Sequence, residues 1–323
     1  MKRTLKSIGI LSLVAMLATG GAFGQQLPQF SQYIFNGLHV NPGYAGYKGE
    51  PYLQSTYRSQ WIDFPGAPET FTVTADLSAN EGTMGFGFSL LSDQLGPART
   101  TTGLLTYAYR IQTGRKSFLG LGASVGVSEY MIDGALFDPN DQGDVLIPEG
   151  RVNMFTPNLN TGLFFHNDKF YAGFSVYNMI GKNSLEQEDI ALAYHDFHYY
   201  LTAGAMLNLS DNVGFKPSFL IRQVKGAPTN YDINGMFLFF ERLWVGASYR
   251  SNMKLWTEVD QDLTSRNAVA AIIEVFATDR LRLGYAYDQS LNVLQDYRHN
   301  SHELSVGFYM IPRTAKMKNQ RWF

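Results

Sequence analysis

The 323-residue chain contains no cysteine. A protein without thiols forms no disulfide framework, performs no thiol chemistry and offers no cysteine for lipid attachment behind a leader peptide. Beyond the leader described next, no run of about 18 apolar residues occurs, so the sequence predicts no transmembrane helix. Charged residues make up only 17% of the chain and the formal net charge is −2. This balance gives no electrostatic reason to bind nucleic acid, and we expect no such partner.

The first 24 residues have the pattern of a cleaved secretory signal peptide. Lys2, Arg3 and Lys6 form a positive start, an apolar run covers 8–18, and small residues at 22 and 24 precede the cleavage position. Removing three positive charges changes the formal net charge from −2 to −5. A buried N-terminal helix is the alternative interpretation. Export leaves two classes open, a soluble periplasmic protein and an outer-membrane barrel.

Apolar and small residues alternate with period two along much of the remaining chain. Phe86, Phe88 and Leu90 share one face of their segment, whereas glycine and serine occupy the other. The segments 119–126 and 280–287 repeat this pattern. Because successive strand side chains point to opposite faces, each segment is expected to be a strand with one apolar and one small or polar face. A soluble β-sandwich remains the alternative, but it would expose a charged face. A barrel in lipid with a closely packed interior accounts better for the glycines.

The pattern predicts an all-β fold, a transmembrane outer-membrane β-barrel of about 14 antiparallel strands. Aromatic residues near strand ends suit the membrane interfaces, namely Tyr107, Tyr109, Tyr285 and Tyr287. Short and longer connections are expected to alternate, with the longer ones at 61–68, 92–98, 129–157, 179–198, 225–229, 252–265 and 289–301. The strands are expected at 52–60, 69–78, 83–91, 99–112, 117–128, 158–166, 169–178, 199–209, 213–224, 230–240, 243–251, 266–277, 280–288 and 302–311.

Four segments follow from this organisation. They are a signal peptide over 1–24, a motif segment over 25–51, the barrel over 52–311 and a basic C-terminal tail over 312–323. An even strand count places both ends of the barrel chain on the periplasmic side, so both termini are expected there. The motif segment is then either periplasmic or folded into the barrel as a plug. The tail is expected to be either a solvated end or a periplasmic contact arm.

The motif segment QFSQYIFNGLHVNPGYAG resembles the N-terminal signature of the PorP/SprF family of type IX secretion system outer-membrane proteins. The resemblance continues through YRSQW, GAPET, DQLGP, YAYRI, KPSFLIR, LRLGYAYD and SHELSVGF, and so spans nearly the whole mature chain. Gly37 and Gly43 depart from the family pattern, which has proline and alanine there. The residues that match, and that we expect to bind a partner or form a plug, are Phe30, Ser31, Gln32, Tyr33, Phe35, Asn36, Asn41, Pro42, Tyr44 and Gly46, and Ala45 also fits.

The resemblance implies an outer-membrane component of protein export and, in some members, gliding motility in a Gram-negative bacterium. Its implied partners are periplasmic ring and linker proteins of the type IX machinery, or the C-terminal signal domain of a secreted adhesin. Outer-membrane lipid is expected to surround the barrel. A gated transport barrel for a small or apolar solute is the alternative function, and a surface enzyme is a third hypothesis. The resemblance does not choose between family branches.

The hypothesis of a surface enzyme depends on histidines at the barrel rim. His195 and His198 lie near one predicted strand end, and His299 and His302 near another, so a metal or hydrolase site is conceivable. Isolated pairs of loop histidines more often form ordinary hydrogen bonds. The loop 138–144 lacks the glutamate that closes an EF-hand calcium loop. We therefore expect no catalytic residue, no metal site and no cofactor. Four arginines lie in predicted strands or at their ends, namely Arg58, Arg110, Arg222 and Arg250. They should point inward or lie at the rims, because a charge that faces lipid is costly. Inside the barrel they could pair with acids such as Asp76 and Glu274.

Overall fold

The structure is a computed structural model that describes residues 27–62, 64–137, 150–180, 186–187, 190–191, 196–225, 227–253, 268–291 and 300–311. Several sequence expectations lie outside these residues: the signal peptide, the acidic loop, His195, His299 and the basic tail. No helix among the described residues is long and apolar enough to cross a membrane.

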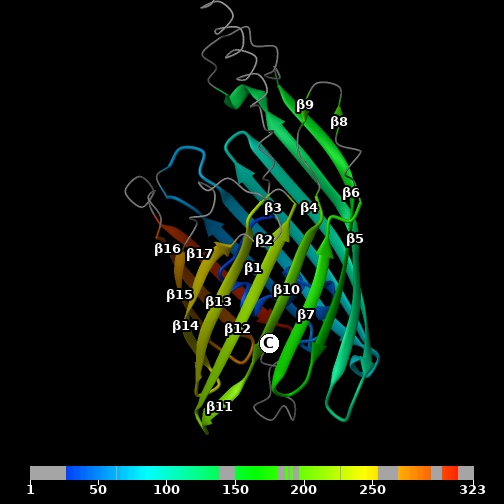
Figure 1. The fold of residues 1–323 in the computed structure, drawn as a ribbon, viewed down its shortest axis with the longest axis vertical. Helices are drawn as coiled ribbons and strands as arrows, with labels where there is room; N and C mark the ends of the chain where they lie inside the picture. Colours follow the sequence, from blue (N-terminus) through cyan, green and yellow to red (C-terminus); the bar gives the residue numbers. More distant parts are fainter. Residues whose placement is uncertain are drawn as a thin grey trace, which may run out of the picture.

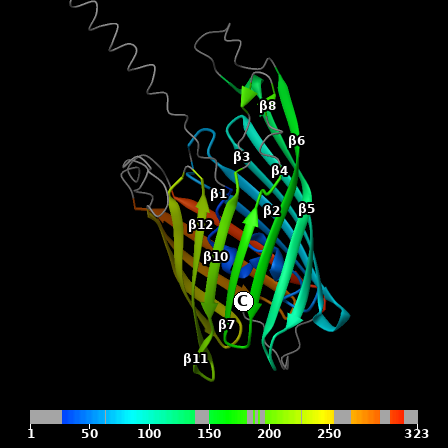
Figure 2. The same ribbon diagram turned by 45° about the vertical axis from the view of Figure 1, so that its right-hand side comes forward.

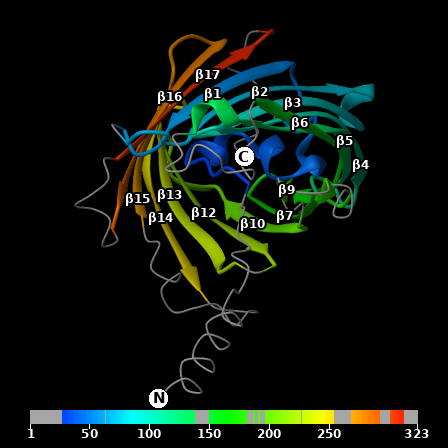
Figure 3. The same cartoon turned by 90° about the horizontal axis from the view of Figure 1, so that it is seen from above.

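The described chain forms one closed antiparallel barrel (Figures 1 and 3). The sheet runs in the order β10-β7-β6-β5-β4-β3-β2-β1-β17-β16-β15-β14-β13-β12-β11, and β10 also pairs with β12, which closes the ring. Because β11 follows β10 at the same position in the wall, the barrel has 14 strand positions, as predicted. A separate two-stranded sheet consists of β8 (Glu186–Gln187) and β9 (Ile190–Ala191). The wall strands are β1 (Tyr52–Ser59), β2 (Glu69–Ala79), β3 (Met84–Leu95), β4 (Ala98–Gln112), β5 (Phe118–Asp133), β6 (Arg151–His166), β7 (Phe170–Tyr177), β10 (His198–Ala205), β11 (Leu207–Ser210), β12 (Val213–Val224), β13 (Thr229–Phe239), β14 (Leu243–Met253), β15 (Ala268–Phe276), β16 (Leu281–Ser290) and β17 (Ser301–Tyr309).

The outer and inner faces of the wall differ in polarity, as the period-two alternation predicts. Apolar side chains point outward and polar or small ones point inward, so the wall is the reverse of a soluble protein and matches a barrel whose outer surface faces lipid. On β2, for example, Phe71 and Leu77 are exposed while Thr72 and Asp76 are buried. The other strands supply the rest of the outward apolar surface, including Leu53, Phe86, Phe88, Leu105, Tyr107, Tyr109, Leu121, Val125, Leu163, Phe174, Leu201, Ile233, Ile273, Leu283, Leu304 and Phe308.

One end of the barrel carries the short connections and the other carries most of the longer ones. The short connections are 80–83, 113–117, 167–169, 211–212, 240–242 and 277–280. At the other end, two predicted connections were too long. The 92–98 connection is a turn at Gly96-Pro97, where Gly96 has φ +56, and the 129–157 connection shrinks to 134–150. Ladder hydrogen bonds continue here through polar residues such as Asp93 and Glu129, which an apolar alternation does not reveal.

The wall is uneven in height. β5 and β6 have 16 residues each, whereas β1, β7 and β10 have 8 each. At about 3.3 Å per residue, β6 extends about 53 Å and β7 about 26 Å. Figures 1 and 2 show β5 and β6 rising together beyond β7 at the end with the longer connections.

The motif segment lies inside the barrel and crosses its interior, drawn in blue in Figure 3. It forms three short 3-10 helices, η1 (Gln32–Phe35), η2 (Gly37–His39) and η3 (Pro42–Tyr44). The Leu27 amide donates to His198 Nε2 (3.3 Å) at the long-connection end, whereas the Met310 amide donates to the Pro51 carbonyl at the short-turn end. Leu27 and Met310 therefore lie at opposite ends of the barrel. The termini themselves, which we expect on the periplasmic side, lie outside the described residues, so that expectation stays a prediction. The strand count fixes the ends of the barrel wall, but it does not fix a segment that passes back through the interior.

Candidate functional site: the N-terminal segment in the barrel interior

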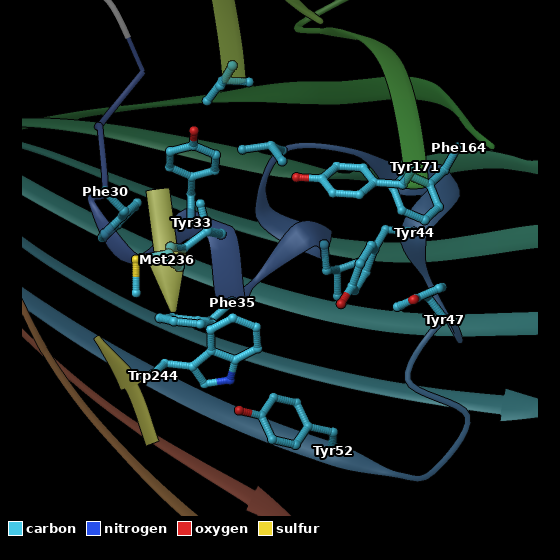
Figure 4. Packing of buried hydrophobic residues seen from close by; sticks show 14 of the residues in the cluster. Phe30, Tyr33, Phe35, Tyr44, Tyr47, Tyr52, Phe164, Tyr171, Met236 and Trp244 are labelled. Atoms are coloured by element: carbon cyan, nitrogen blue, oxygen red, sulfur yellow. The ribbon is translucent and has the colours of Figure 1, made fainter. Parts of the chain in front are cut away.

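Aromatic side chains fix the middle of the segment to the wall (Figure 4). The Phe35 ring lies against Trp244 of β14, with 5.9 Å between ring centroids. The Tyr44 ring packs edge-on against Phe164 of β6 at 5.2 Å and beside Tyr47 at 5.0 Å. Burying each large aromatic side chain stabilises the docked segment by about 1.5–3 kcal/mol. The segment thus forms one hydrophobic core together with inward apolar side chains of the wall, such as Met236 and Trp244.

Acidic residues of β16 and β17 hold the start of η1. The Ser31 and Gln32 amides donate to the two carboxylate oxygens of Glu303, at 2.8 and 2.9 Å. The Ser31 hydroxyl donates to Asp288 at 2.7 Å. Arg58 forms ion pairs with both acids, at 2.5 Å to Asp288 and 3.0 Å to Glu303. Free amides at a helix start favour negative charge, so the buried arginine and acids form one network with the segment.

Two buried lysines hold the end of η1. Lys216 Nζ donates to the Ile34 carbonyl at 3.0 Å, and Lys48 Nζ donates to the Phe35 carbonyl at 3.1 Å. Lys48 also lies 3.3 Å above the centre of the Tyr52 ring. Cations near free helix carbonyls are stabilising. Acids at one end of η1 and lysines at the other therefore fix the direction of the helix as well as its position.

Asn41-Pro42-Gly43 docks onto glycines of the wall. Asn41 Nδ2 donates to the carbonyls of Leu163 (2.8 Å) and Phe174 (3.4 Å), and its Oδ1 accepts from the Gly43 amide. A Cβ added to any inward glycine along this path would overlap the segment. These wall glycines therefore have a specific cause, which is close approach of the segment. Its backbone approaches Gly85, Gly120 and Gly122, and the Asn41 side chain approaches Gly162 and Gly173.

The last part of the segment is bonded to the wall on the way to β1. The Gly46 amide donates to Asp76, and Gly46 adopts φ +73, which suits glycine. Arg110 Nη2 donates to the Ala45 carbonyl at 3.2 Å. His39 lies with its ring edge-on to Phe30 at 4.6 Å. Burial lowers the pKa of His39 to about 4, and a hydrogen bond with the Pro28 backbone opposes this shift only in part.

All ten residues that the sequence marked as partner-binding or plug residues are buried in the barrel interior. Eight of them are at most 8% exposed, and Pro42 and Gly46 are also buried. In this conformation they contact the wall and each other, and they are not accessible to a protein outside the barrel. A void of about 20 Å³ between the segment and the wall has room for about one water.

The rim histidines in the described chain do not form a common site. His198 contacts the Leu27 amide and the Asp196 carbonyl, whereas His302 is bonded to the Tyr285 hydroxyl on the outward side of the wall. Within the described residues no group of three His, Asp or Glu side chains could hold a metal ion.

The four strand arginines do point inward, but their acidic partners differ from the pair that the sequence suggested. Arg222 and Arg250 both pair with Asp232 of β13. Glu274 instead pairs with Arg282, and Asp76 accepts from the segment. The pairing depends on strand register, which the sequence did not provide.

Sequence reasoning missed the wall residues that hold the segment, notably Glu303, Asp288, Lys216 and Trp244. A usable signal was present, because Glu303 and Asp288 fall on the inward face of their period-two patterns. Charge on that face requires a partner inside the barrel. The identity of the partner, Ser31 and Gln32, was not readable without the fold.

A closed barrel with an apolar outer surface, a polar inner wall and an internally docked segment defines the class of outer-membrane β-barrel proteins. Within that class, the chain belongs to the PorP/SprF family. The family model described as "Type IX secretion system membrane protein PorP/SprF" matches residues 22–308, which includes the docked segment and almost all of the wall.

Solved structures share the barrel architecture at low sequence identity. The CymD monoaromatic hydrocarbon channel has a TM-score of 0.50 and 9% identity, over 86% of this chain and 94% of that chain. A Pseudomonas aeruginosa FadL homologue has a TM-score of 0.47 and 12% identity, over 90% of this chain and 96% of that chain. Likeness at this level reports on fold alone. A comparison with curated proteins gives no match.

Proposed function

We propose that this protein is a non-enzymatic assembly component of the type IX secretion system that binds a protein partner at the outer membrane. The partner is either a periplasmic ring or linker protein of the machinery or the C-terminal signal domain of a secreted adhesin. The single observation that carries this proposal is the family signature itself, because its residues fill the barrel interior. A filled barrel is suited to anchoring rather than to passage of solute.

The orientation of the barrel is part of the proposal. Outer-membrane barrels have short periplasmic turns and longer outer connections, so the short-turn end is assigned to the periplasm. Tyr309 and Met310 then lie at the periplasmic face, where a basic tail could reach the secretion machinery. Leu27 lies toward the cell exterior. Both faces of the membrane are thus reachable by different parts of one chain.

A crosslinking pull-down from intact outer membranes, combined with conductance of the purified barrel, tests the proposal. Recovery of secretion components or of one surface protein, with no conductance, is the expected result. Steady conductance without any protein partner would instead establish a transport barrel for a small solute.

The role of the segment in partner binding is tested with Phe35→Ala and Tyr44→Ala. Because both side chains are internal, we expect each variant to reduce partner recovery indirectly, by loosening the segment. Leu53→Ala on the outward face of β1 is the matched control and should leave recovery unchanged. Equal recovery from all three variants would exclude the segment from partner binding.

A further inference from the structure

Among the described residues, no strand pairs with one of the two backbone edges of upper β6. β6 pairs with β5 along its whole length, from Arg151 to His166. On its other side it pairs with β7 only from Thr161 to His166. A transmembrane strand needs about 9–11 residues, so the upper residues of the 16-residue β6 extend beyond the membrane at the long-connection end.

The direction of the backbone groups along this edge follows from the ladder. The Gly134 amide donates to the Gly150 carbonyl, so in the same register the even-numbered residues of β6 bond to β5. The odd-numbered residues direct their N–H and C=O groups to the opposite side. Consistent with this, the Leu159 carbonyl accepts from the Met179 amide. Within the described part of the chain, Met179 is the last residue that bonds to this edge.

Two asparagines of β6 turn the following chain away from the edge. Asn178 has φ +59, a left-handed conformation that ends β7. Asn160 Oδ1 accepts from the Asn178 amide at 2.9 Å, and Asn158 Nδ2 donates to Asn178 Oδ1 at 3.2 Å. These contacts stabilise the conformation in which β7 stops. Within the part of the chain that the structure describes, specific side chains of β6 thus leave the edge above Leu159 without a paired strand.

The sequence of the edge is compatible with addition of a strand. Pro157 has no N–H, and its nitrogen faces the open side. The proline therefore removes no hydrogen bond between β6 and β5. Three backbone N–H donors remain along this edge, on Arg151, Asn153 and Phe155. The carbonyls of the same three residues and of Pro157 are the four backbone acceptors. An unpaired row of this kind is a template for another strand.

Apolar side chains flank the same edge on both faces. Phe155 points outward and is 64% exposed, although it lies above the expected membrane band. On the inner face Met154 packs with Tyr130, Ile132 and Val152 as a small separate cluster. An added strand with alternating apolar residues would cover Phe155 with one face and extend the Met154 cluster with the other.

We propose that an extended segment of a protein partner, with alternating apolar residues, docks as an additional strand on β6 over Arg151–Pro157. Backbone hydrogen bonds would provide affinity, and Phe155 and Met154 would select apolar residues. The inference rests on the proposed function for the existence of a protein partner, and it adds the place and geometry of docking.

Residue-resolved amide hydrogen exchange tests this geometry, because even-numbered amides of β6 bond to β5 whereas odd-numbered amides face the open edge. In the purified barrel, the amides of Val152 and Met154 should be protected by β5, and those of Asn153 and Phe155 should exchange rapidly. In intact outer membranes the odd-numbered amides should also become protected. Protection of these amides in the purified barrel would mean that the chain covers its own edge, and rapid exchange in both preparations would mean that no strand adds. Either result overturns the proposal.

A pair of substitutions at one position provides the control. Asn153→Pro removes an edge N–H without removing a bond to β5, whereas Asn153→Ala keeps the N–H. Protection of Phe155 in membranes should be lost in the proline variant and retained in the alanine variant, and both should fold. If Asn153→Pro leaves partner recovery and Phe155 protection unchanged, the docking site is wrong while the assembly function stands. If the unmodified protein recovers no partner, the assembly function itself fails.

Discussion

Single residues decide how firmly the segment is docked. Glu303 receives two segment amides and an arginine, and it is fully buried. Removing one member of such a buried charged network leaves the others unpaired, which is strongly destabilising. The absence of cysteine makes these contacts measurable, because one introduced thiol reports on the segment without background. Leu38→Cys is a suitable reporter, since Leu38 is 4% exposed.

We predict that Glu303→Gln weakens docking of the segment by about 2–4 kcal/mol. Labelling of Leu38→Cys by a maleimide should then become at least about tenfold faster. Asp279→Asn is the control, since its ion pair with Arg242 is exposed on both sides and such pairs contribute little. An unchanged labelling rate in Glu303→Gln would show that the carboxylate does not hold the segment.

Gly122→Ala should displace the segment while leaving the wall intact. The new methyl group would overlap the backbone of Pro42 and Gly43, and forced overpacking typically costs about 1–3 kcal/mol. Gly103→Ala on β4 should have no such effect, because nothing lies within 4 Å of that Cβ. The measurement is again the labelling rate of Leu38→Cys, and equal rates in the two variants would contradict the close-approach argument.

Docking of the segment should weaken in mild acid. The ordinary pKa of His39 is 6.5, and burial lowers it to about 4 in the docked state. The released state therefore binds more protons, so docking is strongest above pH 6.5 and is progressively lost as the pH falls toward 4. Labelling of Leu38→Cys, corrected for thiol ionisation, should rise between pH 7.5 and 5. His39→Gln should remove this rise, and a rise of the same size in that variant would assign it to another group.

At the scale of elements, the barrel and the segment depend on each other. An eight-stranded barrel is filled by its own side chains, whereas much larger barrels leave an aqueous channel. A barrel with 14 strand positions lies between these cases and leaves space that η1, η2 and η3 occupy. The inward glycines increase that space and bring the two backbones into contact.

A variant without residues 27–50 should therefore conduct ions in planar bilayers, whereas the intact protein should not. The exposed inner wall would carry charged residues such as Arg58, Asp232 and Glu303, which hydrate a pore. Heat-modifiable migration on gels would verify that the variant is folded. A folded but closed variant would show that the segment is not what blocks the interior.

At the scale of the whole molecule, the chain passes through its own barrel before building it. The segment starts beside His198 at one end and enters β1 at the other. With the proposed orientation, the first described residues lie toward the cell exterior although the barrel strands start and finish at the periplasmic face. Assembly must then enclose the segment as the wall closes.

Cysteine accessibility in intact cells measures this arrangement. Leu27→Cys should react with a membrane-impermeant maleimide from outside, whereas Met310→Cys should react only after the outer membrane is permeabilised. Met310 is exposed, so an absent reaction in intact cells is not due to burial. The reverse pattern would invert the proposed orientation, and reaction of both from one side would contradict the threaded path.

The sequence by itself determined the strands, their number, their outward apolar faces and the family, because each depends on local alternation or on motif residues such as Asn41-Pro42-Gly43. It also showed that arginines in strands must avoid lipid. Only the tertiary structure decided what Glu303, Lys216 and Gly122 contact, because these contacts join residues far apart in the chain. The path of the segment through the interior was likewise decided by packing and hydrogen bonding against the wall, since a chain end has no alternation from which its position can be read.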